Sequence, residues 1–72
     1  MPSESEISKI IEIMRRRTTN EDVLNMVKEV GKKLSNEELY YFIWGIALYY
    51  LIRLSPKDIA EIKEVLGVTS WQ

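Results

Sequence analysis

The run LYYFIWGIALYYLIRL at residues 39–54 limits what this chain can fold into more than any other feature. No charged residue occurs between Glu38 and Arg53. A helix of this composition is apolar on opposite sides, so it lies inside a helical bundle or contributes to an interface. At about 100° per residue, one face combines Leu39, Phe42, Ile43, Ile46, Tyr50 and Leu54. The opposite face combines Tyr40, Tyr41, Trp44, Leu48, Leu51 and Ile52.

The same run is too short for a membrane span, which needs roughly 20 apolar residues. Its Tyr and Trp side chains are spread along the run, whereas membrane spans gather them in a belt at each end. The N-terminal residues Met1-Pro2-Ser3-Glu4 lack the basic and apolar regions of a signal peptide. We therefore expect a soluble, cytoplasmic protein with no membrane partner.

Four helix start signals recur along the chain, each with a polar cap followed by acidic residues. Ser3 with Glu6 and Ser35 with Glu38 have the spacing of a capping box, and Thr19 precedes Asp22 at the same spacing. Ser55 is followed by a proline at the first helical position. Between these signals, apolar residues recur at helical spacing. We expect helices at 4–16, 20–33, 36–53 and 56–66.

The predicted fold is therefore all-α: a compact four-helix domain over residues 1–72, with the apolar third helix as its central spine. Basic residues close the first two helices, and Gly67 is expected to cap the fourth in a left-handed conformation, with Val68 folding back on it. No run alternates with the period of a strand. Trp71 is expected to dock on the bundle, because a small core gains from one more large ring.

A chain of 72 residues buries only about 60% of its unfolded surface, so its stability is marginal without additional support. Cys and His are both absent, which removes disulfides and the usual zinc ligands. Close packing or self-association is left as the source of stability. The missing Cys, the single Gln and the many Ile, Glu and Lys residues also suit a thermophilic protein.

The same absences argue against catalysis, because His is the commonest general base and Cys the best nucleophile. The glycines are isolated, so no phosphate-binding loop is present. The Glu61–Glu64 and Glu37–Glu38 pairs lie on stretches already explained by capping and solvation. We expect a protein that is not an enzyme and that has no cofactor or bound metal.

The function that the sequence favours is a protein–protein interaction module. Three short amphipathic helices cannot easily cover both faces of the third helix, and monomers rarely leave a large apolar patch exposed. Tyr and Trp are also favoured at interface hot spots. We expect self-association, most simply as a homodimer, or docking as a small accessory subunit of a larger assembly. The predicted interface is Tyr40, Tyr41, Trp44, Leu48, Leu51 and Ile52.

The alternative at this point is a spine helix that its own chain buries completely. A second alternative is nucleic-acid binding through a basic cluster, with a dimer doubling the charge. Its candidate residues are Arg15, Arg16, Arg17, Lys32 and Lys33. The net charge of −1 gives no overall attraction to phosphate. No helix-turn-helix has the right spacing and polarity to read a DNA groove.

Overall fold

The computed structural model describes residues 1–69, in which four helices and no strands are present. The helices are α1 (Glu4–Arg15), α2 (Glu21–Gly31), α3 (Asn36–Tyr49) and α4 (Pro56–Leu66). The predicted all-α, four-helix fold is confirmed. The prediction for Trp71 lies outside the described residues. No helix in the described part of the chain is both long and apolar enough to cross a membrane.

The helix starts follow the predicted capping chemistry. Ser3, Ser35 and Ser55 each accept a hydrogen bond from a backbone N–H three residues on, and the acidic residue there completes a capping box. In α2 the cap is Asn20, one residue after the predicted Thr19, and its side chain accepts from the N–H groups of the second and third helical residues. Asn caps as well as Ser does, so the local chemistry is unchanged.

The end of α3 differs most from the prediction, because the helix stops at Tyr49 and not at residue 53. Leu51 adopts a left-handed conformation with φ of 57°. The chain then turns back, and the Ile52 N–H donates to the Ala47 carbonyl at 2.8 Å. This is the pattern of a Schellman cap, in which glycine usually holds the left-handed position.

Gly67 forms the predicted left-handed cap of α4, with φ of 66°. The Val68 N–H donates to the Lys63 carbonyl at 3.0 Å, so the chain folds back on the end of the helix as expected. Val68 also packs against the hydrophobic core. The two left-handed caps therefore end α3 and α4 by the same backbone geometry, one at a leucine and the other at a glycine.

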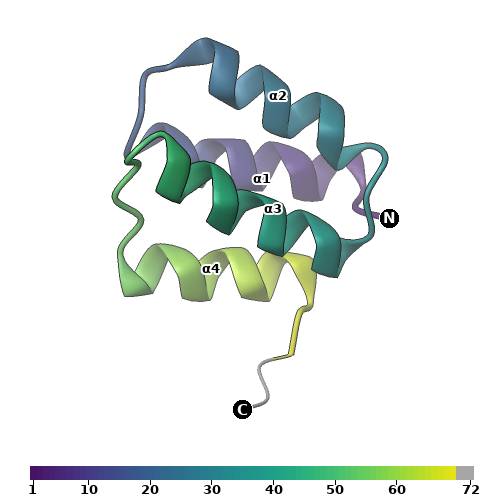
Figure 1. The fold of residues 1–72 in the computed structure, drawn as a ribbon. Helices are drawn as coiled ribbons and strands as arrows, with labels where there is room; N and C mark the ends of the chain where they lie inside the picture. The colour runs from purple at the N-terminus through teal and green to yellow at the C-terminus, as the bar shows by residue number, and fades with distance from the viewer. Residues whose placement is uncertain (70–72) are drawn as a thin grey trace.

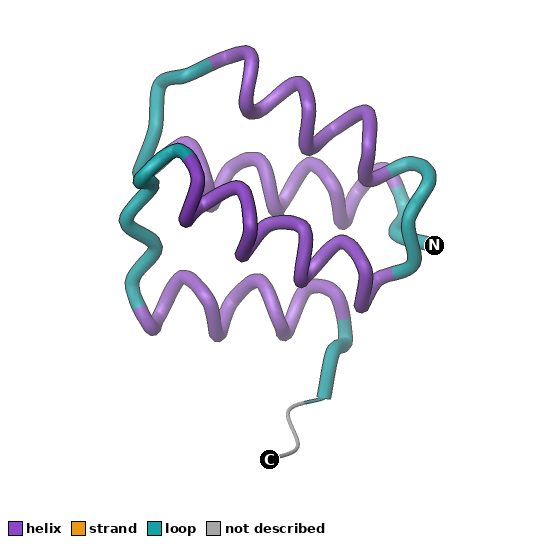
Figure 2. Tube along the Cα trace, viewed as in Figure 1, coloured by secondary structure: helices purple, strands orange, loops and turns teal. Residues whose placement is uncertain are grey.

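Consecutive helices run antiparallel and form an up-down-up-down bundle (Figure 1). α1 packs against α2 and α4, and α3 packs against the same two helices, whereas the backbones of α1 and α3 do not approach each other. Short loops join the helices at alternate ends of the bundle (Figure 2). α3 therefore occupies a corner of the bundle, in contrast to the central position expected for it. A corner helix has one side that its own chain does not cover.

Aliphatic side chains from all four helices fill the core between these corners. Gly31, at the end of α2, is buried where a Cβ atom would lie 3.3 Å from the Leu39 side chain and 3.4 Å from that of Ile7. This close approach lets the end of α2 pack beside the starts of α1 and α3. The side chains with almost no exposed surface are Ile10, Met14, Val23, Leu24, Val27, Leu39, Ile43 and Ile62, together with Asp58.

Candidate interaction surface

Large apolar side chains remain exposed along the outer side of α3 and in the turn that follows it. We call these six residues the α3 apolar surface. Their exposed fractions are 60% for Tyr41, 41% for Trp44, 71% for Leu48, 80% for Tyr49, 41% for Tyr50 and 83% for Leu51. Taking about 200 Å² for one fully exposed large side chain, these fractions amount to roughly 750 Å². The largest apolar patch on a typical monomer is about 300–600 Å².

Four of the six residues predicted from the sequence lie on this surface: Tyr41, Trp44, Leu48 and Leu51. The other two, Tyr40 and Ile52, are each only 8% exposed, so they belong to the core. Tyr40 lies on the flank of α3, where the Lys63 amino group is 6.0 Å from its ring centre. Ile52 is buried because the chain turns back after Leu51.

Tyr49 and Tyr50 are the members of the α3 apolar surface that the sequence prediction missed. A regular helix would have placed Tyr50 on the inner face, but α3 ends before it and its ring is partly exposed. The Tyr49 and Tyr50 rings contact edge to face, with centroids 4.9 Å apart. The misplaced helix end explains why Tyr50 was missed, whereas Tyr49 lies within α3 and the sequence assigns it to neither of the two faces.

Gly45 lies between these exposed side chains in the middle of α3. A Cβ atom added there would meet nothing within 4 Å, so no contact within residues 1–69 requires a glycine. A glycine within a helix costs about 1 kcal/mol relative to alanine. Because Gly45 has no side chain, it leaves room for a hollow of about 300 Å³ between α2 and α3. It also lets the backbone of another molecule approach α3 closely. The lining residues are Met26, Phe42, Gly45, Ile46, Tyr49 and Tyr50.

The second predicted site, the run of three arginines at the end of α1, is held by carboxylates. Arg17 contacts Asp58 through Nε at 2.6 Å and Nη2 at 3.3 Å. Arg16 donates to Glu61 at 2.6 Å and lies 3.4 Å from Asp58. Arg15 pairs with Glu21 at the start of α2. Each guanidinium therefore has an acidic partner, and the pairs tie the end of α1 to α4 and α2.

Asp58 is the buried charge in this network, with 1% of its side chain exposed. Hydrogen bonds from Arg17 are the main reason that the pKa of Asp58 falls to about 2. Burial opposes this change, while the Ser55 N–H, which donates at 2.9 Å, supports it. The carboxylate thus caps α4 and anchors α1 at the same time.

Lys32 and Lys33 lie at the opposite end of the bundle from Arg15, Arg16 and Arg17, since α1 and α2 run antiparallel (Figure 1). Lys32 also lies 3.7 Å from Glu29. The structure therefore does not bring the five predicted phosphate-contacting residues into one patch.

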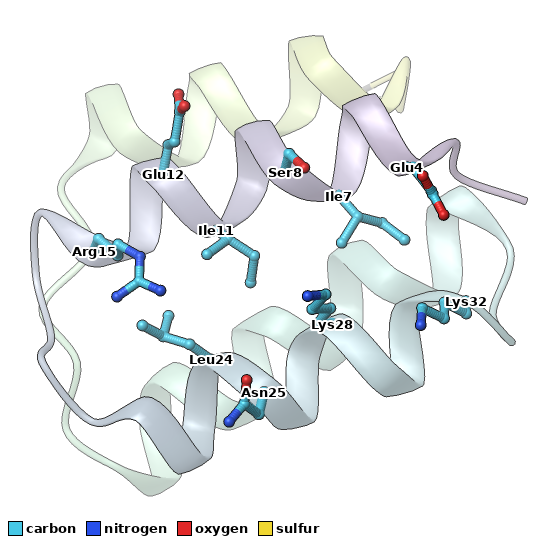
Figure 3. Close-up of a pocket in the computed structure, with 10 residues that line it drawn as sticks. All are labelled: Glu4, Ile7, Ser8, Ile11, Glu12, Arg15, Leu24, Asn25, Lys28 and Lys32. Carbon is cyan, nitrogen blue, oxygen red and sulfur yellow. The ribbon is translucent and has the colours of Figure 1, made fainter.

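An open groove of about 520 Å³ lies at the surface between α1 and α2 (Figure 3). Ile11 and Leu24 point into the space between the two helices, and Glu12 points away from it (Figure 3). The charged groups of Arg15, Lys28 and Lys32 are spread along the groove and do not converge on one point (Figure 3). Within residues 1–69, no group of three or more acidic side chains is placed to hold a metal ion.

Comparison of the chain with protein-family models, with curated proteins and with solved structures finds no match. The site must therefore be interpreted from its own geometry.

Proposed function

We propose that this protein is a non-enzymatic protein–protein interaction module that docks through the α3 apolar surface. In this proposal it self-associates or forms a small subunit of a larger assembly. The observation that carries the proposal is the size of that surface. Its roughly 750 Å² is close to the ~800 Å² that each partner contributes to an interface of standard size.

Two features of α3 support the same proposal, because each lowers the stability of the isolated chain. Gly45 weakens the middle of the helix, and no contact in the described part of the chain needs a glycine there. Leu51 holds a left-handed conformation, which costs a non-glycine residue about 1–2 kcal/mol, and its side chain is almost wholly exposed. Such local costs concentrate at functional sites. Both residues lie on the surface that we assign to docking.

The basic cluster offers weaker support for nucleic-acid binding. Phosphate contacts need guanidinium and ammonium groups that are available to exchange counterions. Here all three arginines already pair with carboxylates, and the lysines lie at the far end of the bundle. We therefore prefer protein docking to nucleic-acid binding.

A photo-cross-linking amino acid at position 48 tests the docking function in cells that express the protein. The same amino acid at Asn25, an exposed position on α2, is the matched control. We expect adducts of discrete mass from position 48 and none from position 25. Equal adduct patterns from the two positions, or no adduct from either, would contradict docking through α3.

A further inference from the structure

We infer that the partner of the α3 apolar surface is a second copy of this chain, with the two α3 helices packed antiparallel about a two-fold axis. The inference rests on the proposed docking function and adds the identity and orientation of the partner. It is carried by the spacing of the exposed side chains and by the charges at the two ends of α3.

The α3 apolar surface of one copy can pack against the same surface of a second copy. Tyr41, Trp44 and Leu48 follow each other on α3 at intervals of three and four residues, which is the spacing of a helix–helix seam. Leu51 follows after three more, in the left-handed turn just beyond the end of α3. Two antiparallel copies that cross near residue 46 place Trp44 opposite Leu48, and bring Tyr41 of each copy to the turn that holds Leu51 of the other.

The antiparallel direction also fits the side-chain volumes. In that direction each large aromatic ring faces a smaller leucine, which is the alternation that fills an interface evenly. A parallel pair would place the Tyr41 and Trp44 rings against their own copies at one end and the leucines together at the other. Gly45, between Trp44 and Leu48 on the helix, lets the two backbones approach near the centre of the seam.

Charge gives an independent reason for the same direction. Glu37 and Glu38 are exposed in the first turn of α3, and Arg53 is exposed just beyond its end. Glu37 and Arg53 have no ion-pair partner within the described residues. An antiparallel pair brings the acidic end of each helix to the arginine of the other. A parallel pair brings the acidic ends together, where they repel.

Closed two-fold symmetry is also the commonest way for a chain to cover its own surface. Each copy then buries the same side chains. Tyr41, Trp44, Leu48 and Leu51 together expose roughly 500 Å², so a seam formed by these four in both copies buries about 1,000 Å². That total is at the lower limit for a specific interface, and Tyr49 and Tyr50 at its edge can add to it.

The chain has no cysteine, so introduced cysteines report the orientation directly. Tyr41→Cys and Leu51→Cys variants are oxidised singly and as a mixture, at a concentration where sedimentation shows the unmodified protein to be dimeric. Antiparallel helices place position 41 of one copy next to position 51 of the other. The two copies of position 41 then lie about 15 Å apart along the axis, beyond disulfide reach. We expect the mixed disulfide to form at least tenfold faster than either homotypic one.

Homotypic disulfides that form as fast as the mixed one would overturn the antiparallel arrangement and leave a dimer in place. A protein that keeps its protomer mass at every concentration would overturn the second copy as partner. In that case, adducts with another protein at position 48 would still support docking through α3, with a different partner. The absence of such adducts would contradict the proposed docking function as well.

Charge reversal provides a second test that leaves the apolar seam intact. Glu37→Arg and Arg53→Glu are each expected to weaken dimerisation several-fold, because each creates like-charge contacts across the interface. The double variant restores opposite charges and is expected to dimerise within about twofold of the unmodified protein. Additive weakening in the double variant would contradict the antiparallel contact.

Discussion

Replacement of Asp58 by Asn tests how strongly the arginine cluster holds the fold together. Asn has nearly the same size and still offers an oxygen to the Ser55 N–H, so neither a cavity nor an uncapped helix follows. The change removes the negative charge that faces Arg16 and Arg17. Those arginines are partly exposed, and water can solvate them after the change. We therefore expect a loss below the roughly 3–5 kcal/mol typical of a fully buried broken pair.

The magnitude follows from the pKa of Asp58. An aspartate has a pKa near about 3.9 in an unfolded chain, and Asp58 has a pKa of about 2 in the folded one. By linkage, ionised Asp58 stabilises the folded state by about 2–3 kcal/mol. Because the folded pKa is the lower of the two, this contribution is complete above about pH 5. It declines as the pH falls below about 4 and is lost only below about 2, where the carboxylate becomes protonated in the folded state as well.

Urea unfolding followed by circular dichroism at about pH 7, 4 and 2.5 measures this contribution. All samples share one protein concentration, because self-association adds stability by mass action. We expect Asp58→Asn to lower the free energy of unfolding by about 2–3 kcal/mol at neutral pH and by much less at the lowest pH. Glu21→Gln, which breaks the exposed pair with Arg15, is the control and should have a far smaller effect. A cost for Asp58→Asn that is the same at all three pH values would refute the linkage argument.

Two substitutions in and after α3 should stabilise the protomer, and both should weaken its association, because each changes the surface that the second copy contacts. Leu51→Gly relieves the left-handed strain and should raise the free energy of unfolding at low concentration by about 0.5–1 kcal/mol. Thr19→Gly, in an exposed loop without positive φ, is the control and should give no such gain. A lower free energy of unfolding for Leu51→Gly would contradict the strain at Leu51. Gly45→Gln should stabilise α3 by about 0.5 kcal/mol. The longer glutamine side chain should also weaken self-association, which light scattering measures. Association as tight as that of the unmodified protein would contradict a close approach of the two helices at Gly45.

The sequence alone predicts the features whose causes lie within a few residues. The capping boxes at Ser3 and Ser35, the helix start at Ser55 and the left-handed cap at Gly67 are of this kind, and the structure has all four. Each depends on a side chain and backbone groups only a few residues away, so the pattern in the chain already contains the whole interaction.

The end of α3 is a different case, because the residue that ends the helix is Leu51, a poor candidate for a left-handed position. No local pattern marked it, and the buried position of Ile52 shows that tertiary packing decides the turn. The role of Asp58 was missed for a related reason, since Arg17 lies 41 residues away in the chain. Burial of Tyr40 likewise depends on where α4 packs. The sequence indicated that α3 has more apolar surface than its neighbours can cover. Which of its residues stay exposed depends on contacts between helices.

The molecular mass in solution tests the central claim, that a second molecule covers the α3 apolar surface. Sedimentation equilibrium over a wide range of concentration compares the unmodified protein with a Trp44→Glu/Leu48→Glu variant. The account predicts that the unmodified protein approaches twice its 8.5 kDa protomer mass. It predicts that the variant remains at the protomer mass with the same helical circular dichroism spectrum. An unmodified protein that stays at the protomer mass throughout, or a variant that unfolds, would contradict the account.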